Sequence, residues 1–290
     1  MTDPDYLVLA HNNVDRLARL VTRLHTGSNQ FFVHFDRGGN DEDFARLIDE
    51  LRDIPCTFIR RRYCRWGRYG LVSATLDGIR EFVAKSTASH VVLVSGADYP
   101  VKSRRAIAEF FDTHPSQSFM RTWAIPRPGW SHGGGTGRFD RWYFGRRFPL
   151  PPARLVKAGH GPRRMPAGLK PFGGWQWFAL DRRTASWLLR YLDSNPKVER
   201  FFKTTHIPDE LMLQTVLRNS PMADDILDSV HYVDWTNGGL HPRTLEAADV
   251  PELVTSTFLY ARKFADEAVL DEVERTLADG SERPEFPDVP

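Results

Sequence analysis

The sequence predicts an α/β fold in which helices flank a mostly parallel sheet. Short apolar runs alternate with longer segments whose apolar residues recur at helical spacing, an order typical of βαβ units. The run from Val91 to Val94 is continuously apolar, as expected of a strand buried on both faces. No repeat or linker is evident, so residues 1–279 are expected to form one domain, followed by a polar tail over residues 280–290.

The first half of the chain carries this alternation most clearly. Its apolar runs, expected to be strands, lie at residues 6–10, 31–35, 56–60, 91–94 and 118–123. Apolar residues recur every three or four positions, as on one face of a helix, over residues 14–24, 44–51, 71–83 and 106–111. Ligands of a parallel sheet bind outside the carboxyl ends of its strands. A site is therefore expected in the loops after Ala10, Phe35, Val94 and Trp123.

The segment 124–172 interrupts the alternation. It is rich in proline, contains Gly133-Gly134-Gly135, and holds Asp140 as its one acidic residue among many arginines and lysines. Such a long loop has two interpretations: a lid or ligand-binding loop that attracts an anionic group, or a solvated insertion without a ligand. After it, strands are expected at 175–180 and 230–233, and helices at 184–192, 210–217 and 266–277.

The charge balance and cysteine content exclude some classes of protein. Lys and Arg total 39 and Asp and Glu 37, a formal net charge of +2, which does not fit a general nucleic-acid binder. Cys56 and Cys64 cannot form a disulfide framework and favour a reducing, cytoplasmic location. The acidic first residues do not resemble a signal peptide, and no run approaches the ~20 apolar residues of a membrane span.

Several chemical motifs are missing from the sequence. There is no Gly-x-Gly-x-x-Gly after the first expected strand, no Walker phosphate loop, no Gly-x-Ser-x-Gly and no zinc-site spacing. The acidic clusters Asp3-Pro4-Asp5 and Asp41-Glu42-Asp43 follow no strand, and the turn after the central apolar run offers only Asp98. No metal site is therefore expected.

A series of short segments carries a resemblance to a known family. They are Ala10-His11; Val33-His34-Phe35-Asp36; Trp66-Gly67 with Leu71-Val72-Ser73-Ala74; Ser95-Gly96-Ala97-Asp98-Tyr99-Pro100-Val101-Lys102-Ser103; Trp175-Gln176-Trp177-Phe178-Ala179-Leu180; Pro208-Asp209-Glu210 with Gln214-Thr215-Val216; Tyr232-Val233-Asp234-Trp235; and Ala261-Arg262-Lys263-Phe264. In this order they resemble the core-2/I-branching β-1,6-N-acetylglucosaminyltransferase family, which includes the peptide O-xylosyltransferases.

The resemblance implies a glycosyltransferase A-type fold and an inverting, metal-independent transfer of sugar from a UDP-sugar to an acceptor hydroxyl. UDP-GlcNAc and UDP-xylose are the favoured donors, UDP-glucuronate stays open as an alternative, and no cofactor is implied. A single displacement needs a general base for the acceptor proton and positive charge at the departing diphosphate. Glu210 matches the family's catalytic base. Its place in the first turn of an expected helix offers a second interpretation, that it complements the helix dipole.

The resemblance also assigns residues to the donor. Lys263 and Arg243 match two cations that neutralise the diphosphate in the family. Both types of side chain can bind phosphate oxygens. Arg262 is a competing candidate for that role. Asp36 matches a carboxylate that contacts the uridine, and His11 is expected to line the same pocket, although a lone histidine is more often structural.

Aromatic residues are expected at the acceptor. Trp235 matches an aromatic residue that stacks on acceptor sugar, whose C–H face a flat ring covers well. Trp175 and Trp177 alternate along an expected strand; Trp177 is assigned to the core, and Trp175 is left open between the core and sugar binding. Asp98 either orients donor or acceptor hydroxyls or bonds the backbone of its own turn.

The partners follow less directly. Vertebrate members of the family are anchored in membranes of the secretory pathway and carry several disulfides, and the chain shows neither feature, which suggests a bacterial-type cytosolic form. The acceptor is expected to be a glycan, a peptide or a small molecule, with peripheral membrane contact if that acceptor is lipid-linked. A rival hypothesis is a non-catalytic glycan- or polyanion-binding protein that keeps the fold.

Overall fold

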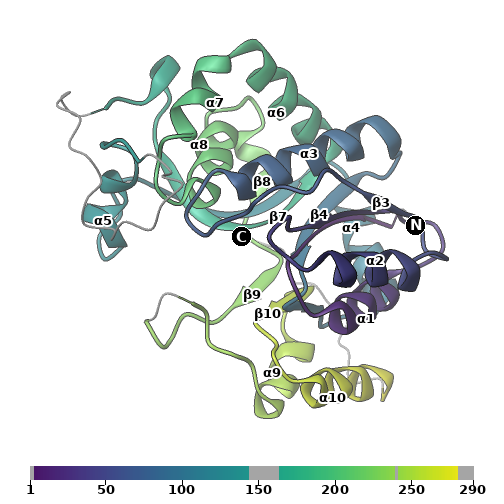
Figure 1. Ribbon diagram of the computed structural model, residues 1–290. Helices are drawn as coiled ribbons and strands as arrows, with labels where there is room; N and C mark the ends of the chain where they lie inside the picture. The colour runs from purple at the N-terminus through teal and green to yellow at the C-terminus, as the bar shows by residue number, and fades with distance from the viewer. Residues whose placement is uncertain (1–2, 144–162, 239–240, 280–290) are drawn as a thin grey trace.

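A seven-stranded sheet lies at the centre of the computed structural model, which describes residues 3–143, 163–238 and 241–279 (Figure 1). The strands are β1 (Asp5–Ala10), β2 (Phe31–Phe35), β3 (Cys56–Phe58), β4 (His90–Ser95), β6 (Ser118–Ala124), β7 (Phe172–Asp181) and β8 (Ile226–Leu227). Their order is β3-β2-β1-β4-β7-β6-β8. Within this sheet β7 is antiparallel to both neighbours, and the other pairs are parallel. The predicted α/β class with a mostly parallel sheet is confirmed.

Helices cover both faces of the sheet because its central strands are apolar on both sides. On β1, Tyr6 and Val8 belong to one core cluster, whereas Leu7 and Leu9 belong to the other. The first cluster is completed by helices α1 (Val14–Leu24), α2 (Asp41–Glu50), α4 (Arg104–Thr113), α9 (Val250–Thr255) and α10 (Glu267–Ala278). The second is completed by α3 (Gly70–Lys85), α6 (Arg182–Ser194), α7 (Pro196–Phe202) and α8 (Met212–Arg218).

A second sheet positions several predicted site residues. It consists of β5 (Asp98–Pro100), β10 (Tyr260–Arg262) and β9 (His231–Val233), with β10 in the middle. β10 runs antiparallel to β5 and parallel to β9, so Arg262 lies opposite Asp98 on one side and Val233 on the other. The segments that follow β9 and β10 therefore leave the small sheet at the same end.

Some elements differ from the sequence-based expectation. The strand expected at 56–60 ends at Phe58. The helix expected at 210–217 divides into a 3-10 helix (Pro208–Glu210) and α8, because Leu211 leaves the helical region with a φ of −137°. Within the insertion 124–172 the described residues form α5 (Ser131–Gly134) and two short 3-10 helices. Residues 144–162 and the expected tail lie outside the described residues.

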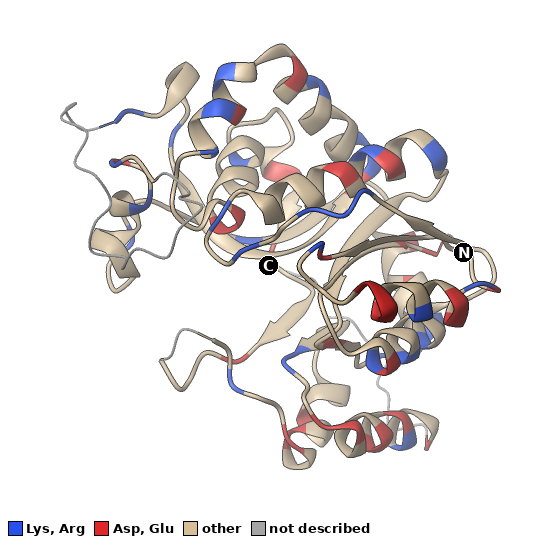
Figure 2. Cartoon of the chain, viewed as in Figure 1, with Lys and Arg blue, Asp and Glu red and all other residues tan. Residues whose placement is uncertain are grey.

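Ion pairs connect α10 to α1. Figure 2 marks the acidic residues along α10 in red and the basic residues of α1 in blue. The Arg16 Nε atom lies 2.7 Å from Glu267 Oε1. Arg19 Nη2 lies 2.6 Å from Asp271 Oδ1 and 3.0 Å from Glu274 Oε1. Because these groups are partly exposed, each pair contributes little stability alone, but together they form a network between the two helices.

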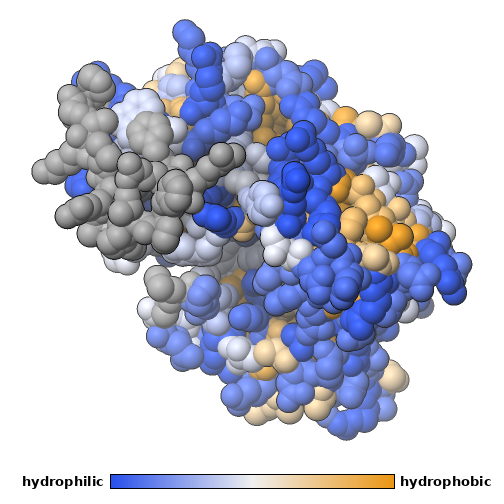
Figure 3. All heavy atoms as spheres, viewed as in Figure 1, coloured by the Kyte–Doolittle hydropathy of each residue, from blue (hydrophilic) through white to orange (hydrophobic). Residues whose placement is uncertain are grey.

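Few of the described residues place a large apolar side chain on the surface. The face drawn in Figure 3 is mostly hydrophilic, with apolar areas set between charged side chains. The exposed large apolar residues are Ile48, Tyr63, Trp66 and Trp235. Among the described residues, none of the helices combines the length and the apolar composition needed to cross a bilayer. Cys56 and Cys64 are free thiols.

Candidate functional site

A cleft of about 730 Å³ opens between the end of β6, the first half of β7 and the segment after β9. This volume lies within the ~300–1,000 Å³ usual for small-molecule sites. Five of the chain's eight tryptophans line it: Trp66, Trp123, Trp130, Trp175 and Trp235. Its charged and titratable lining residues include Arg121, Arg127, His132, Arg138 and Glu210. The cleft thus combines aromatic rings with a single described carboxylate, a composition suited to binding sugars.

Glu210 reaches this cleft from the 3-10 helix that precedes α8. Its Oε2 atom lies 2.6 Å from Nη1 of Arg138, a guanidinium that comes from the insertion and is only 4% exposed. The same guanidinium lies 3.9 Å from the ring centre of Trp130. Glu210 Oε1 has no hydrogen-bond partner among the described residues. The arginine therefore fixes one carboxylate oxygen and leaves the other able to accept a proton.

The turn that holds Glu210 is tied to β7 by a buried amide. Gln214 Nε2 donates to the backbone oxygens of Trp175 and Asp209, at 2.7 and 3.0 Å. The neighbouring Asp209 has a buried Oδ1 atom without a partner among the described residues. Burial, with the negative charge of Glu210 added, raises the pKa of Asp209 to about 7. Two adjacent carboxyl groups in unlike surroundings thus lie at this corner of the fold.

Lys263 and Arg243 lie near the end of the small sheet but differ in their partners. Arg243 Nε lies 2.6 Å from Asp234 Oδ2, and its Nη2 lies 2.7 Å from Asp249 Oδ1. The half-buried Lys263, directly after β10, makes no ion pair or side-chain hydrogen bond with the described residues. Of the two predicted cations, Lys263 is therefore the one whose charge is not already compensated by a described carboxylate.

Asp98 and Arg262 form a buried pair instead of lining the cleft. Arg262 Nη1 lies 2.7 Å from Asp98 Oδ1, and the two side chains are 12% and 0% exposed. The other carboxylate oxygen of Asp98 accepts the backbone N–H of Ser95 at 2.5 Å. The Arg262 guanidinium lies 3.6 Å from the ring centre of Trp177, which packs against the core as expected. The contacts of Asp98 match the turn-bonding alternative for this residue.

Asp36 and His11 lie at the carboxyl ends of β2 and β1, apart from the lining of the cleft. Asp36 accepts the backbone N–H groups of Gly38 and Cys64, at 2.6 and 2.8 Å, and so joins the loops that follow β2 and β3. His11 is exposed. A carboxylate has about four acceptor positions, so two backbone bonds leave Asp36 able to accept from a ligand.

Of the three aromatic candidates, Trp175 and Trp235 line the cleft, whereas Trp177 packs against the core. Trp235 is 38% exposed and lines the cleft. Trp175 also lines the cleft, with the Arg121 guanidinium 4.6 Å from its ring centre. Glu210, Trp175 and Trp235, which are far apart in the sequence, are thus brought to one cleft. Of the four loops expected to form the site, the one after β6 contributes Arg127 and Trp130.

Sequence reasoning missed the partner of Glu210 and part of the aromatic lining. Arg138 is one of many arginines in the insertion, and nothing in its sequence neighbourhood distinguishes it from a solvated residue. Its burial shows that the described part of the insertion packs against the body of the protein. Trp123 lies at the end of an expected strand, where ligands bind, and Trp130 follows in the next loop. Their positions are a signal from which both could have been predicted to line the site.

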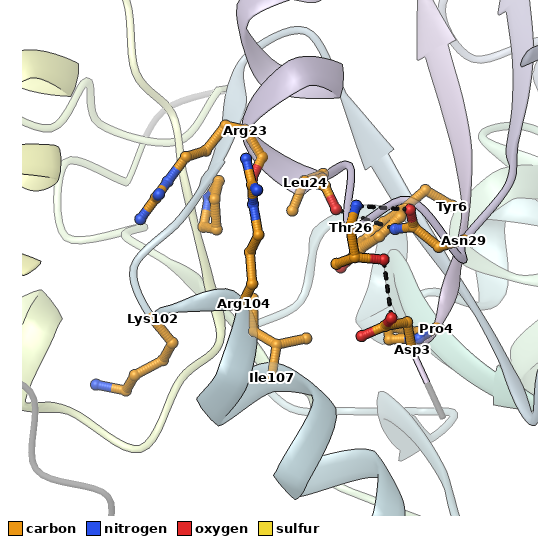
Figure 4. Close-up of a pocket in the computed structure, with 11 residues that line it drawn as sticks. Asp3, Pro4, Tyr6, Arg23, Leu24, Thr26, Asn29, Lys102, Arg104 and Ile107 are labelled. Carbon is orange, nitrogen blue, oxygen red and sulfur yellow. Dashed lines mark hydrogen bonds between the residues drawn. The ribbon is translucent and has the colours of Figure 1, made fainter. Parts of the chain in front are cut away.

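A much smaller cavity lies near the N-terminal end of β1 (Figure 4). Its volume of about 10 Å³ is near the minimum for a single water molecule. Thr26 Oγ1 donates to Asp3 Oδ2 at 2.8 Å on one side, and Arg104 lies on the other. The cavity has no room for a sugar or a nucleotide. Across the described ranges, no three His, Cys, Asp or Glu side chains are grouped as a metal site.

Comparison with known proteins identifies the family to which the chain is similar. The family model described as "Branch: Core-2/I-Branching enzyme" matches residues 5–259. Xylosyltransferase 1 of Canis lupus familiaris is 26% identical over 297 residues, covering 92% of this chain and 29% of that protein. Xylosyltransferase 2 of Rattus norvegicus is 24% identical over 288 residues, covering 89% of this chain and 31% of that protein.

A third relative extends the comparison to an insect. Xylosyltransferase oxt of Drosophila melanogaster is 23% identical over 301 residues, covering 93% of this chain and 33% of that protein. The chain therefore spans about a third or less of the length of these relatives, although they match most of its own length. As the order of its motifs predicts, the chain belongs to the core-2/I-branching enzyme family of glycosyltransferases.

Proposed function

We propose that the chain is an inverting glycosyltransferase that moves a sugar from a UDP-sugar to an acceptor hydroxyl without a metal ion. UDP-xylose and UDP-GlcNAc are the proposed donors, since the similar proteins are named xylosyltransferases and the family is named for branching enzymes. The observation that carries the proposal is the place of Glu210, which lies in an aromatic cleft with one carboxylate oxygen free of described partners.

The proposed reaction is a single displacement. The acceptor oxygen attacks the anomeric carbon of the donor sugar while its proton passes to Glu210. The bond from that carbon to the diphosphate breaks, and its electron pair leaves with UDP. The new charge needs a cation, and Lys263 supports this role because its ammonium group has no described carboxylate partner. Arg243 is proposed as a second cation that shares its charge with Asp234 and Asp249.

The donor nucleotide is proposed to lie along the carboxyl ends of β1 and β2. His11 and Asp36 follow these two strands, and a nucleotide on an open α/β sheet binds at such strand ends. The acceptor would then occupy the tryptophan-lined cleft, where Trp235 and Trp175 supply flat apolar surfaces. Glu210 would lie between these two halves of the site.

The Glu210→Gln variant tests the proposal, because glutamine keeps the shape of the side chain but cannot accept the acceptor proton. Turnover of the responsive UDP-sugar should fall by about 10²–10⁴, while UDP affinity by calorimetry stays within twofold. Glu109→Gln, which alters a partly exposed glutamate on α4, is the matched control and should keep full turnover. Normal turnover with weakened UDP binding would remove Glu210 from the role of base.

Metal independence has its own test. Turnover should persist in excess EDTA, and a strict requirement for Mn²⁺ would contradict the assignment of the diphosphate charge to Lys263. The rival hypothesis of a non-catalytic glycan- or polyanion-binding protein predicts no turnover with any UDP-sugar. Transfer or hydrolysis of a single UDP-sugar by the wild type, lost in Glu210→Gln, would exclude that rival.

A further inference from the structure

Three arginines of the cleft each lie over a tryptophan ring. The guanidinium carbon of Arg121 is 4.6 Å from the ring centre of Trp175, and that of Arg127 is 4.3 Å from the centre of Trp123. The third pair is Arg138 over Trp130, described above. Cation–π contacts of this kind hold flat, positively charged groups against the aromatic wall. The wall is therefore cationic as well as aromatic.

The three arginines differ in how their charge is compensated. Arg138 is paired with Glu210, and Arg121 donates through Nε to Asp228 at 2.8 Å and through Nη2 to the same carboxylate. Arg127 is exposed and has no carboxylate partner among the described residues. Among the described residues that line the cleft, Arg127 thus carries the one uncompensated charge, which is positive and accessible.

Two histidines add little charge to the cleft, and two further tryptophans leave their rings accessible. Burial lowers the pKa of His132, which lines the cleft, and that of the adjacent His206, the latter to about 4. Both are therefore neutral near pH 7 and change the charge of the cleft little. Trp66 and Trp235, 60% and 38% exposed, carry no described cation over their rings. Their faces are open to a saccharide, which stacks its C–H face on such rings.

We propose that the cleft selects a saccharide acceptor that carries an anionic group, held by Arg127 while its sugar rings stack on Trp66 and Trp235. That the bound saccharide is an acceptor rests on the proposed function. The preference for an anionic saccharide depends only on the residues that line the cleft. A guanidinium recognises a carboxylate, sulfate or phosphate by charge-assisted hydrogen bonds, which exceed neutral ones in strength. An acidic peptide shares the charge but offers no sugar rings for the tryptophans.

Calorimetry without donor separates these ligands. The probes are a galacturonate trisaccharide, its neutral methyl ester, a sulfated galactose trisaccharide and an acidic peptide of equal charge. The uronate should bind at least about tenfold more tightly than its ester and than the peptide. Comparison of the uronate with the sulfated sugar shows which anion is preferred. The preference should weaken as salt is raised, because the contact is electrostatic.

Variants assign the preference to residues. Arg127→Gln should reduce the difference between uronate and ester to less than about threefold, whereas Arg190→Gln, an exposed arginine on α6, should leave it unchanged. Trp66→Ala should weaken the uronate and its ester by the same factor, because stacking does not depend on charge. Trp66 is exposed enough that this change should not unfold the protein.

Clear results would overturn the inference. Equal affinity for uronate and ester, tighter binding of the peptide, or a preference that survives Arg127→Gln would each contradict it, as would no binding of the uronate at millimolar concentration. UDP binding is measured on the same samples. Failure to bind UDP would count against the proposed function alone, so the two conclusions can fail separately.

Discussion

The buried pair between Asp98 and Arg262 allows a quantitative prediction about stability. The Asp98→Ala variant removes the carboxylate but leaves the guanidinium of Arg262 in place, with its side chain only 12% exposed. It also removes the acceptor for the backbone N–H of Ser95. The perturbation therefore creates an uncompensated buried charge and an unsatisfied donor at the junction of β5 and β10.

The expected magnitude follows from this burial. Removal of one partner of a buried ion pair costs about 3–5 kcal/mol. A chain of 290 residues has an unfolding entropy of about 0.6 kcal/mol per kelvin near its midpoint. The midpoint of thermal unfolding should therefore fall by about 5–8 °C. Asp98→Asn retains an oxygen that can accept one of the two hydrogen bonds, so its loss should be smaller.

Thermal unfolding followed by circular dichroism is the assay. The control is Asp193→Ala, which breaks a pair with Arg80 whose side chains are 57% and 46% exposed. Exposed pairs contribute about 0–1 kcal/mol, so the midpoint should change by less than about 2 °C. If Asp98→Ala loses no more than this control, the argument from burial is wrong, and Asp98 is again a candidate for binding donor hydroxyls.

Three further predictions concern other parts of the site. Lys263→Ala should weaken UDP binding about tenfold or more by calorimetry, and equal weakening by the exposed Lys197→Ala would deny Lys263 a specific role. Gly173→Ala should destabilise the protein by about 1–3 kcal/mol and alter its tryptophan fluorescence, because a Cβ at this position would lie 2.3 Å from the Trp130 ring. An unchanged fluorescence spectrum would contradict this prediction. Burial raises the pKa of Asp209 to about 7, so the folded state binds the proton more tightly and stability falls as pH rises from about 4 to 7. Asp209→Asn should therefore gain in unfolding midpoint over the wild type between pH 5 and 8, and a difference that does not vary with pH would refute the burial of this carboxyl.

The sequence predicts the parallel half of the fold well because its signals are local. Strands such as Val91–Val94 are continuous apolar runs, and the helices between strands carry apolar residues on one face. Such local patterns do not predict β5 and β10, because each strand has three residues and includes a charged side chain, Asp98 or Arg262. These charges are buried only because they pair with each other, a condition that no local pattern contains.

The candidate site was predictable to a similar extent. The resemblance pointed to Glu210 and Trp235 and left Trp175 open between the core and sugar binding, and the structure places all three in one cleft. It did not indicate that Arg138 contacts Glu210, since the two residues are 72 positions apart and the arginine lies in an insertion without a regular pattern. Equally, the spacing of Arg243 could not show that two carboxylates already bind it, because that contact depends on how the chain turns after β9.

The pairing of β6 with β7 has a consequence for how such a protein can change over evolution. The insertion leaves β6 at Ala124 and returns to β7 at Phe172, and these two residues lie opposite each other in the ladder. Loop closure costs only about 0.6 kcal/mol more for each doubling of loop length. The segment between them can therefore lengthen or shorten without shifting the register of the sheet, so that recognition of new acceptors can diversify as long as Arg138, which contacts Glu210, is retained.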